Sequence, residues 1–510
     1  MKSKSRSHQQ KGDSYFSTEH LNADLGKRSA RSGAVTVVIQ GSKFVLTMAT
    51  TSVLARILVP EDFGLLAMVG SVLVFVAMFQ DAGLSMATVQ KDRINHEQVS
   101  MLFWLNTAAG TLVAGLIVAL SPVIALVFGD DRLGPIAMAL AIPTFLSGVC
   151  AQHGALLQRQ MRFGTEQGIM IASQVVGSLV AIASALHGAG YWSLVLKVVS
   201  AAVLVVVLRW FASGWTPSLP KRGSGAREMV HFGAHLTAGN FFMTATRNVD
   251  TLLLGYFLGP IVTGLYSKAY GLLMLPVREI NKPMGIVALP TLSRLQGDPE
   301  RFRRFYLRGL ELVCCLSMPI VAYAAVAADE VVLLVLGPSW MGTVDIFRAL
   351  APAAFMGATN VATGWLFVPM GRGKDQFLLT LIGSVVTVAG FIVGLQWGAI
   401  GVAASFSVTS VCLKVPGLMY ATKGSPVSLL DIARIAVRSV VASAVASVVL
   451  LAFERRQDFE NVFFENCAFF GIFISVFALT VLALPGGRGF ARELSELLSK
   501  VLSGRKNRSS

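Results

Sequence analysis

Charged residues are scarce in this chain. Aspartate, glutamate, lysine and arginine make up only 14% of its 510 residues, whereas hydrophobic residues make up 54%. Because soluble proteins carry about a quarter charged residues, this composition excludes an ordinary soluble domain and predicts a chain that lies in a lipid bilayer. The formal net charge is +15, but the basic residues flank apolar runs instead of forming a polar domain. A nucleic-acid partner is therefore not expected.

Cysteine and metal-ligand patterns are also sparse. The five cysteines all fall in apolar runs, and only Cys314 and Cys315 are adjacent, so neither a disulfide framework nor a thiol metal site is predicted. His231 and His235 are spaced i, i+4 but lack the glutamate of a zinc-protease motif, and no phosphate-binding loop precedes a helix. No internal loop is long enough to form a glycosyltransferase domain. We therefore expect neither enzyme activity nor a cofactor or metal.

The N-terminal segment lacks the apolar core of a secretory signal peptide. Residues 1–32 are polar and include Lys2, Lys4, Arg6 and Lys11. A signal peptide needs an apolar stretch of about 7 to 15 residues after its basic start, and none is found here. The segment is therefore predicted to be a disordered, basic cytosolic tail.

Long apolar runs dominate the rest of the chain. A hydrocarbon core about 30 Å thick needs about 20 apolar residues per helix, and fourteen runs meet that length. Leucine, valine, alanine and glycine fill them without the period-two alternation of a membrane β-barrel, so the predicted fold is an all-α polytopic membrane protein. The predicted spans are 34–57, 65–89, 99–121, 135–157, 167–187, 192–212, 233–257, 265–292, 306–327, 345–369, 377–396, 400–421, 431–453 and 462–484.

Lysine and arginine are distributed unequally among the connections between these spans. Connections on the side of the N-terminus carry most of these residues, and connections on the opposite side carry few. Because basic loops are retained in the cytosol, the asymmetry predicts a multi-pass protein with both termini in the cytoplasm.

The chain contains an internal repeat. Around a Pro-x-x-x-Gly turn, Thr51, Leu54, Leu58, Pro60, Gly64 and Leu65 recur as Thr251, Leu254, Leu258, Pro260, Gly264 and Leu265. Farther along, and at an offset of 210 residues, Ala139, Leu140, Ala141, Phe145, Gly154, Leu156 and Arg162 recur as Ala349, Leu350, Ala351, Phe355, Gly364, Leu366 and Arg372.

The repeat predicts the domain organisation. Each copy holds six predicted helices, an even number, so both copies enter the membrane in the same direction. We expect two parallel six-helix lobes that face each other across a cleft, followed by two helices without a counterpart. The predicted parts are a basic cytosolic tail (1–32), an N-lobe (33–213), a cytosolic linker (214–230), a C-lobe (231–423), helices thirteen and fourteen (424–486) and a second basic tail (487–510).

Ionisable residues inside the spans mark candidate binding positions, because they are costly in lipid unless they face a cavity or a partner. Lys43 and Arg247 each lie on the first helix of a lobe, and our hypothesis is that both contact one anionic group, such as a diphosphate. Asp250 is spaced i, i+3 from Arg247, so these two can equally form a buried structural pair. Both interpretations stay open from the sequence.

The eighth predicted helix combines charge with proline. Arg278 and Lys282 are candidate substrate-binding residues in a helix that its prolines are expected to bend. The corresponding second helix carries its own interruption, and paired interruptions in two halves indicate a transporter's binding or gating region. Prolines that merely shape the bundle are an equal alternative. The candidate gating residues are Asp81, Gly83, Pro276, Pro283 and Pro290.

With the further basic residues in the predicted spans, basic side chains outnumber acidic ones there. Arg348 is also a substrate-binding candidate. Lys197, Lys414 and Arg348 can instead snorkel to the interface or form structural pairs. Lys268 lies on the eighth helix with the residues described above.

Two sequence blocks resemble a known family. The first is LARILVPEDFGLLAM followed by FQDAGLSMATVQ, and the second is LLLGYFLGPIVTGLYSKAYGLLMLP. Both are similar to the polysaccharide transporter family, the Wzx, WzxC and ExoT-like oligosaccharide flippases of the multidrug/oligosaccharidyl-lipid/polysaccharide (MOP) exporter superfamily. The resemblance covers nearly all of residues 33–484.

The resemblance implies a V-shaped helical fold with a cationic cavity in the bacterial inner membrane. It implies a flippase that moves undecaprenyl-diphosphate-linked oligosaccharide repeat units by alternating access, for exopolysaccharide, lipopolysaccharide or capsule biosynthesis. The partners implied are the lipid-linked oligosaccharide, the bilayer, and a polysaccharide polymerase with its export machinery. The family has no strict ligand motif, so the candidate residues above are inferred from their positions in this sequence and not from the resemblance.

Two other functions are considered. A multidrug or cation antiporter of the same superfamily would rely on buried carboxylates for ion coupling. The ionisable residues in the spans are mostly basic, so this function is less expected. A membrane polysaccharide polymerase or ligase would carry a large periplasmic loop, whereas the predicted outer loops are short.

Overall fold

The computed structural model describes residues 25–81, 83–91, 94–220, 227–454 and 462–489. Side chains are described over the same ranges except for residues 25–39, 79, 81, 227–247, 361–362, 454 and 462. The predicted tail segments 1–24 and 490–510 therefore lie outside the described residues, whereas residues 25–32 form the first turns of a helix.

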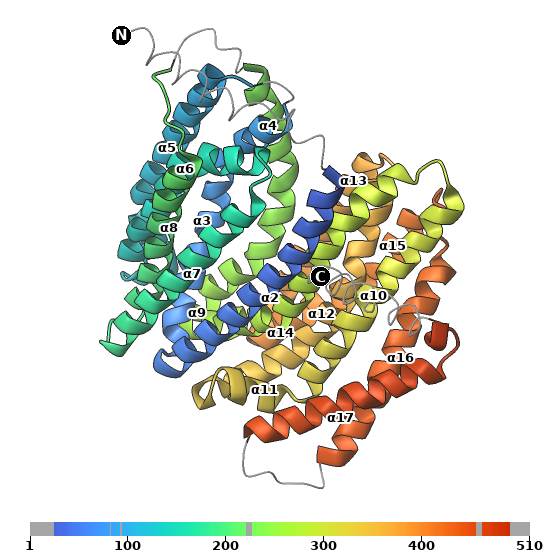
Figure 1. Ribbon diagram of the computed structural model, residues 1–510. Helices are drawn as coiled ribbons and strands as arrows, with labels where there is room; N and C mark the ends of the chain where they lie inside the picture. The colour runs from blue at the N-terminus through green and yellow to red at the C-terminus, as the bar shows by residue number, and fades with distance from the viewer. Residues whose placement is uncertain (1–24, 82, 92–93, 221–226, 455–461, 490–510) are drawn as a thin grey trace, which may run out of the picture. The chain divides into compact units, whose positions relative to one another are not determined.

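The described chain is helical throughout and contains no strand, which confirms the predicted all-α class (Figure 1). Its helices are α2 (Leu25–Ile57), α3 (Pro60–Asp81), α4 (Leu84–Gln90), α5 (His96–Phe128), α6 (Leu133–Arg159), α7 (Phe163–Leu186), α8 (Trp192–Ser213), α9 (Arg227–Arg294), α10 (Pro299–Val326), α11 (Ala328–Val335), α12 (Val344–Phe367), α13 (Gly373–Gly394), α14 (Gly398–Cys412), α15 (Lys414–Thr422), α16 (Leu429–Glu454) and α17 (Val462–Ala483), with 3₁₀ turns η2 (Pro338–Thr343) and η3 (Leu395–Trp397).

Ten stretches of the described residues are long and apolar enough to cross a membrane. The stretch from Asn248 to Arg294 contains residues 248–257 of one predicted span and all of the next, because α9 continues through a kink at Gly259, where φ is 77° and ψ is −175°. The stretch from Gly373 to Thr422 likewise joins two predicted spans. The protein is thus a multi-pass membrane protein, and the count of fourteen spans stays a prediction.

Local sequence explains where several helices begin and end. Asn95 caps α5 by accepting a hydrogen bond from the Gln98 amide, and the Gln98 side chain accepts one from the Asn95 amide in return. Gly129 ends the same helix in the left-handed conformation that glycine adopts at low cost. Asp298 caps α10, where Pro299 occupies the first helical position.

The described chain divides into two compact units. Unit 1 comprises residues up to Lys268 together with Thr380–Val402, and unit 2 comprises Ala269–Leu379 and the residues from Ala403 onward. These bounds differ from the lobes in the sequence analysis, whose extents stay a prediction. Each unit has its own hydrophobic core.

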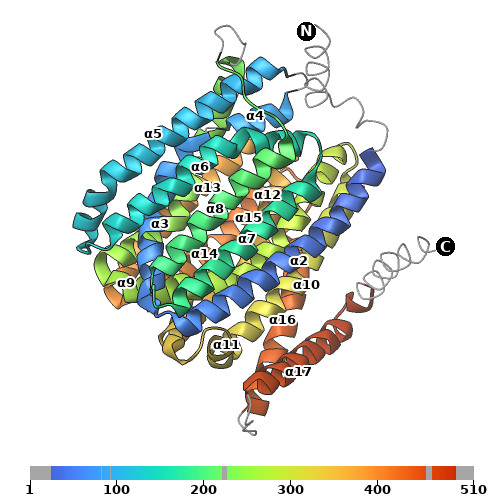
Figure 2. The ribbon, with the colours of Figure 1, turned by 60° about the vertical axis from the view of Figure 1, so that its left-hand side comes forward.

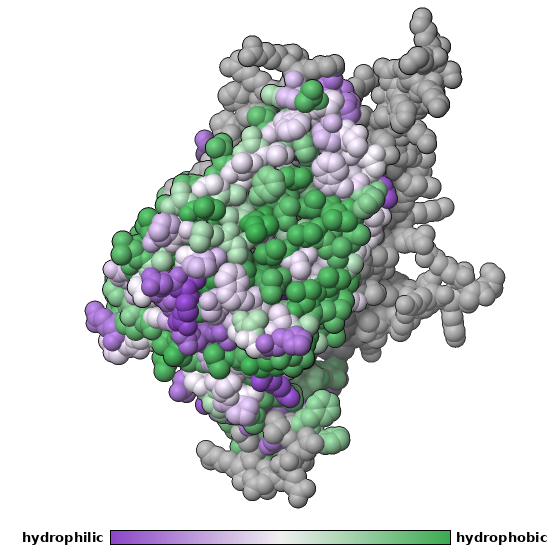
Figure 3. All heavy atoms as spheres, turned by 90° about the vertical axis from the view of Figure 1, so that its left-hand side faces the viewer, coloured by the Kyte–Doolittle hydropathy of each residue, from purple (hydrophilic) through white to green (hydrophobic). Residues whose placement is uncertain are grey.

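In unit 1, helix α6 packs against both α5 and α8, and α7 packs against α8 and α2. Figures 1 and 2 both show α2 running beside α7. One core cluster of this unit joins α3, α5 and α6 around Leu65, Met68, Ile117, Leu133 and Ile136. Apolar side chains also cover much of the outside. On the face drawn in Figure 3, hydrophobic residues spread over a broad area, as expected for a surface in contact with lipid, and a compact hydrophilic group lies at its lower left.

In unit 2, α10 packs against α12 and α16, and α16 packs against α17 (Figure 2). The two helices without a repeat counterpart, α16 and α17, are therefore part of the packed unit. Arg303 of α10 donates to both carboxylate oxygens of Asp431 on α16, at 2.9 and 2.6 Å, and farther along the same helices Arg438 pairs with Glu311. Tyr323 and Phe473 belong to the apolar cluster between α10, α16 and α17.

The internal repeat is visible in side-chain contacts. Arg162 Nη1 donates to the carbonyl oxygen of Ala212 at 2.8 Å, at the end of α8 in unit 1. Its repeat counterpart Arg372 donates from Nη1 to the carbonyl oxygen of Ala421 at 3.1 Å, at the end of α15 in unit 2. An arginine at the equivalent repeat position therefore donates to a terminal carbonyl of the sixth helix in each copy.

Candidate functional site

The two Pro-x-x-x-Gly turns of the repeat meet each other inside unit 1. A Cβ placed on Gly64 would lie 1.7 Å from the carbonyl oxygen of Pro260, and a Cβ placed on Gly264 would lie 1.9 Å from the carbonyl oxygen of Pro60. The contact is reciprocal, so the start of α3 and the stretch of α9 after its kink are related by an approximate two-fold axis. Only glycine at both positions allows so close an approach of the backbones.

Beside this contact, Lys268 of α9 faces an aromatic ring. Its Nζ lies 3.8 Å from the centroid of the Phe63 ring on α3, a cation–π contact. Lys197 lies on α8 in the same unit. Among the described residues, neither lysine forms an ion pair or a side-chain hydrogen bond. Both lysines stand out in the sequence as ionisable residues in apolar runs, whereas Phe63 does not, because no sequence spacing connects α3 with the second half of α9.

Lys43, the predicted site residue of the first helix, belongs to a polar seam between α2 and α7. Its Nζ donates to Gln167 Oε1 at 2.6 Å. Farther along the same two helices, Gln174 donates to Thr47 and Thr50 donates to Ser178, at 2.8 and 3.0 Å. These contacts place Lys43 at a helix–helix contact, and its role in binding substrate stays a prediction.

Asp250 is buried in α9 and held by hydroxyl and amide donors. Tyr266 Oη donates to Asp250 Oδ2 at 2.9 Å, and the Thr251 amide donates to Oδ1 at 2.6 Å. The Asp250–Tyr266 hydrogen bond spans the kink at Gly259 and so connects the two halves of α9. The side chain of Arg247 lies outside the described residues, so the predicted Arg247–Asp250 pair and the shared site with Lys43 stay predictions.

The predicted site residues of unit 2 are exposed. The Arg278 guanidinium lies 5.4 Å from the Tyr270 ring, and Lys282 is exposed one turn farther along α9. Arg348 forms an ion pair with Asp329 at the start of α11, which is one of the structural pairings that the sequence left open. Lys414 donates to Asn360 Oδ1. None of these contacts tests substrate binding.

The predicted helix interruptions differ between the two copies. Helix α3 ends at Asp81, and α4 begins at Leu84 after Gly83, whose φ is 69°. In α9, by contrast, Gly259 is the position with non-helical backbone angles, and the helix continues through its three prolines. Pro276, Pro283 and Pro290 all lie within α9, and the gating role of these five residues stays a prediction.

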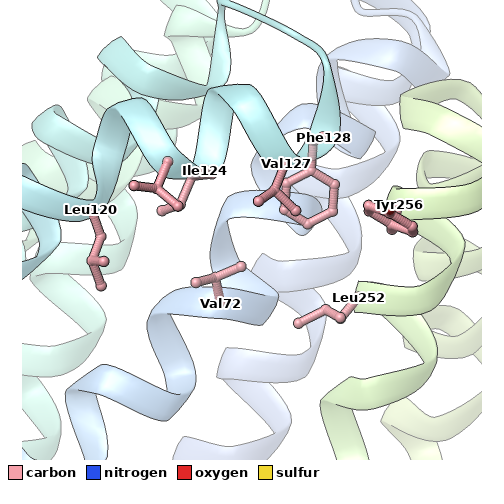
Figure 4. Close-up of a pocket in the computed structure, with 8 residues that line it drawn as sticks. Val72, Leu120, Ile124, Val127, Phe128, Leu252 and Tyr256 are labelled. Atoms are coloured by element: carbon pink, nitrogen blue, oxygen red, sulfur yellow. The ribbon is translucent and has the colours of Figure 1, made fainter.

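Unit 1 also contains an apolar pocket of about 190 Å³ (Figure 4). Figure 4 shows Ile124, Val127 and Phe128 of α5 above Val72 of α3, with Leu252 and Tyr256 of α9 at one side. Leu120 and Val123 complete the lining. Tyr256 supplies the single polar atom of these side chains, so the pocket suits hydrocarbon and offers nothing to a charged group.

A buried ionic cluster in unit 1 was not predicted. Arg209 of α8 pairs with Glu166 of α7 and contacts the Cys150 sulfur at 3.4 Å. Gly154 leaves the space for it, since a Cβ there would lie 2.9 Å from the guanidinium carbon. His153 stacks on Trp210 with ring centroids 4.4 Å apart. In the part of the chain that is described, no group of His, Cys, Asp or Glu is arranged to hold a metal ion.

These features define a polytopic α-helical membrane protein. Its fold is similar to that of the solved lipid II flippase MurJ in its inward closed conformation, with a TM-score of 0.70 over 90% of this chain and 99% of that one, at 14% identity. An inward-facing multidrug resistance transporter of the MATE family matches with a TM-score of 0.58 over 78% of this chain and 98% of that one, at 13% identity.

Sequence comparison assigns this membrane protein to a family. The family described as polysaccharide biosynthesis protein matches residues 53–345, so the chain belongs to that family. The lipopolysaccharide biosynthesis protein WzxC of Escherichia coli (strain K12) is 25% identical over 74% of this chain and 77% of its own length. The succinoglycan biosynthesis transport protein ExoT of Rhizobium meliloti (strain 1021) is 26% identical over 71% of this chain and 73% of its own.

Proposed function

We propose that this protein is a flippase that moves lipid-linked oligosaccharide repeat units across the bacterial inner membrane. The substrate would be an undecaprenyl-diphosphate-linked oligosaccharide that is used to make exopolysaccharide, lipopolysaccharide or capsule. Relatives that are named for lipopolysaccharide biosynthesis and succinoglycan transport support this proposal, and so does a fold shared with a lipid flippase.

The observation that carries the proposal is the pairing of Lys268 with Phe63. A lysine within a membrane-spanning helix is costly unless it meets a partner or a polar ligand. Lys268 contacts an aromatic ring and no carboxylate among the described residues. Such a group suits an anionic headgroup and repels a cationic drug.

The mechanism that we propose is alternating access. The glycan and its diphosphate pass through the helical bundle, while the hydrocarbon tail stays in the bilayer, so bare charge never crosses lipid. Substrate-binding candidates are Lys43, Arg247, Asp250, Arg278, Lys282 and Arg348. Both termini would face the cytoplasm, and a polysaccharide polymerase on the outer side would receive the product.

A deletion strain tests this function. We expect lipid-linked glycan to accumulate on the cytosolic side, because the headgroup cannot cross without a carrier, and the wild-type gene to restore export. Glycan in each leaflet can be measured with an impermeant probe in spheroplasts. Normal glycan export in the deletion strain would contradict the proposal.

A cation or drug antiporter is the second candidate, and buried Asp250 is the observation that favours it. Carboxylates of this kind can bind coupling ions, and Asp250 has only neutral donors among the described contacts. Unchanged glycan export together with altered drug resistance in the deletion strain would support this alternative.

A further inference from the structure

We propose that the apolar pocket of unit 1 binds an acyl chain of a bilayer phospholipid whose headgroup carries an ammonium group, such as phosphatidylethanolamine. The pocket lies between α3, α5 and α9 (Figure 4). The inference concerns a lipid that stays bound to the protein. It therefore goes beyond the proposed transport of a lipid-linked oligosaccharide and does not depend on it.

The pocket has the size and shape of a hydrocarbon chain. Its volume of about 190 Å³ exceeds the ~150 Å³ of an apolar cavity that stays dry and takes up benzene. The lining residues of α5 share one face of that helix from Leu120 to Phe128, and at a rise of 1.5 Å per residue they extend over about 12 Å. An elongated space along a membrane-spanning helix suits an extended chain better than a compact ring.

The pocket opens toward the lipid. Val123, Val127 and Tyr256 of its lining are 49%, 49% and 52% exposed, whereas Ile124 is buried. Leu126, beside them on α5, is 81% exposed, and α5 is long and apolar enough to cross a membrane. An exposed apolar surface on such a helix faces acyl chains and not water, so a chain of the bilayer can enter the pocket from the side.

Direct packing closes the space next to the pocket but not the pocket itself. A Cβ placed on Gly255 of α9 would lie 2.7 Å from Met68 Cγ on α3 and 3.1 Å from Phe128 Cε1 on α5. The three helices therefore touch at Gly255, while Leu252 and Tyr256 on either side of it line the pocket. A chain in this gap would supply the van der Waals contacts that an empty space lacks.

Charged residues gather at one end of the pocket. Phe128 is the last residue of α5 and part of the lining. The turn that follows stays on the end of this helix, because the Asp130 amide donates to the Ala125 carbonyl at 3.1 Å. Arg132 pairs with Asp130 at 2.7 Å and with Glu61 of α3 at 2.6 Å. These charges therefore lie at the end of α5 that contributes Phe128 to the pocket.

The sign of these charges selects the headgroup. The turn after α5 and the first turn of α3 carry four carboxylates, from Glu61, Asp62, Asp130 and Asp131, and one cation, Arg132. An ammonium group is attracted to this excess of negative charge. The diphosphate of the proposed transport substrate and the anionic headgroup of phosphatidylglycerol are repelled by it. The pocket therefore suits a zwitterionic lipid and not the tail of the transported one.

Val123→Trp tests the pocket, because it places a large ring in the lining. Val118→Trp is the matched control, since Val118 lies on the same helix and is 45% exposed but is not part of the lining. Purified full-length protein is titrated with phosphatidylethanolamine in detergent, and bound lipid is counted by native mass spectrometry. We expect Val123→Trp to weaken binding by about tenfold, the loss expected for about ten close carbon–carbon contacts, and the control to bind as the wild type does.

Tyr256→Phe is a second, milder variant. It keeps the aromatic ring and removes the one hydroxyl of the lining, which can donate to an ester carbonyl at the membrane interface. We expect binding of phosphatidylethanolamine to weaken by about fivefold, the loss of one neutral hydrogen bond, with an unchanged thermal midpoint of the lipid-free protein. This variant decides the question if Val123→Trp does not fold.

Lipids with identical acyl chains test the headgroup. Phosphatidylethanolamine should bind about tenfold more tightly than phosphatidylglycerol, the difference expected for one charged hydrogen bond, and undecaprenyl diphosphate should not displace it. Equal binding of the two phospholipids would overturn the headgroup assignment. Displacement by undecaprenyl diphosphate would assign the pocket to the tail of the transported lipid, and unchanged binding in both pocket variants would show that the lipid binds elsewhere. None of these measurements depends on transport.

Discussion

At the scale of single residues, the partner of a charge is more informative than its position in a span. Lys43 and Lys414 contact amide oxygens, Arg348 contacts a carboxylate, and Lys268 contacts a ring. All four looked alike in the sequence, where each was a basic residue in an apolar run. Partners on other helices could not be predicted, because they depend on how helices pack and not on spacing within one helix.

The glycine of the first repeat turn gives a residue-scale prediction. We expect Gly64→Ala to destabilise the protein by about 1–3 kcal/mol, the usual cost of overpacking, because the added Cβ would meet the Pro260 carbonyl. Gly70→Ala, on the same helix with open space around it, should be neutral or stabilising. Thermal unfolding in detergent compares the two. Equal midpoints for both variants would show that the turns do not touch.

At the scale of helices, sequence periodicity and length located the apolar runs well, and the repeat predicted that two turns correspond. It did not predict that these turns touch, because the offset of 200 residues gives correspondence and not proximity. The sequence also placed a break between residues 257 and 265, whereas α9 continues there through one kinked glycine. The short helix α11 was missed, since its eight residues are too few for a membrane span.

The contact between α10 and α16 gives an element-scale prediction. Glu311→Gln should destabilise the protein by about 3–5 kcal/mol, because it leaves Arg438 of a membrane-spanning helix without its carboxylate partner. Glu300→Gln, an exposed change in the first turn of α10, is the control and should have little effect. Protein abundance and thermal midpoint are the measurements. If Glu311→Gln leaves protein abundance and thermal midpoint unchanged, the packing of α16 does not depend on this pair.

At the scale of the whole molecule, the distribution of basic residues predicts orientation. In a cysteine-free background, Asp131→Cys should react with an impermeant maleimide added to spheroplasts, because the turn between α5 and α6 is predicted to lie outside. Lys374→Cys, at the start of α13, should react only after permeabilisation. Both positions are exposed. The reverse pattern would invert the predicted topology, and labelling of both from outside would contradict the predicted number of spans.

The departure of Lys268 from the internal repeat has a consequence for how this protein could have arisen. A chain built from two copies of its first half would carry Gly64 twice and could form the turn-to-turn contact, but it would have Met68 where Lys268 now stands. Such an ancestor could fold around the same contact between its turns without a lysine beside it. The cation–π contact between Lys268 and Phe63 would then be the younger feature, added to one half after the architecture was complete.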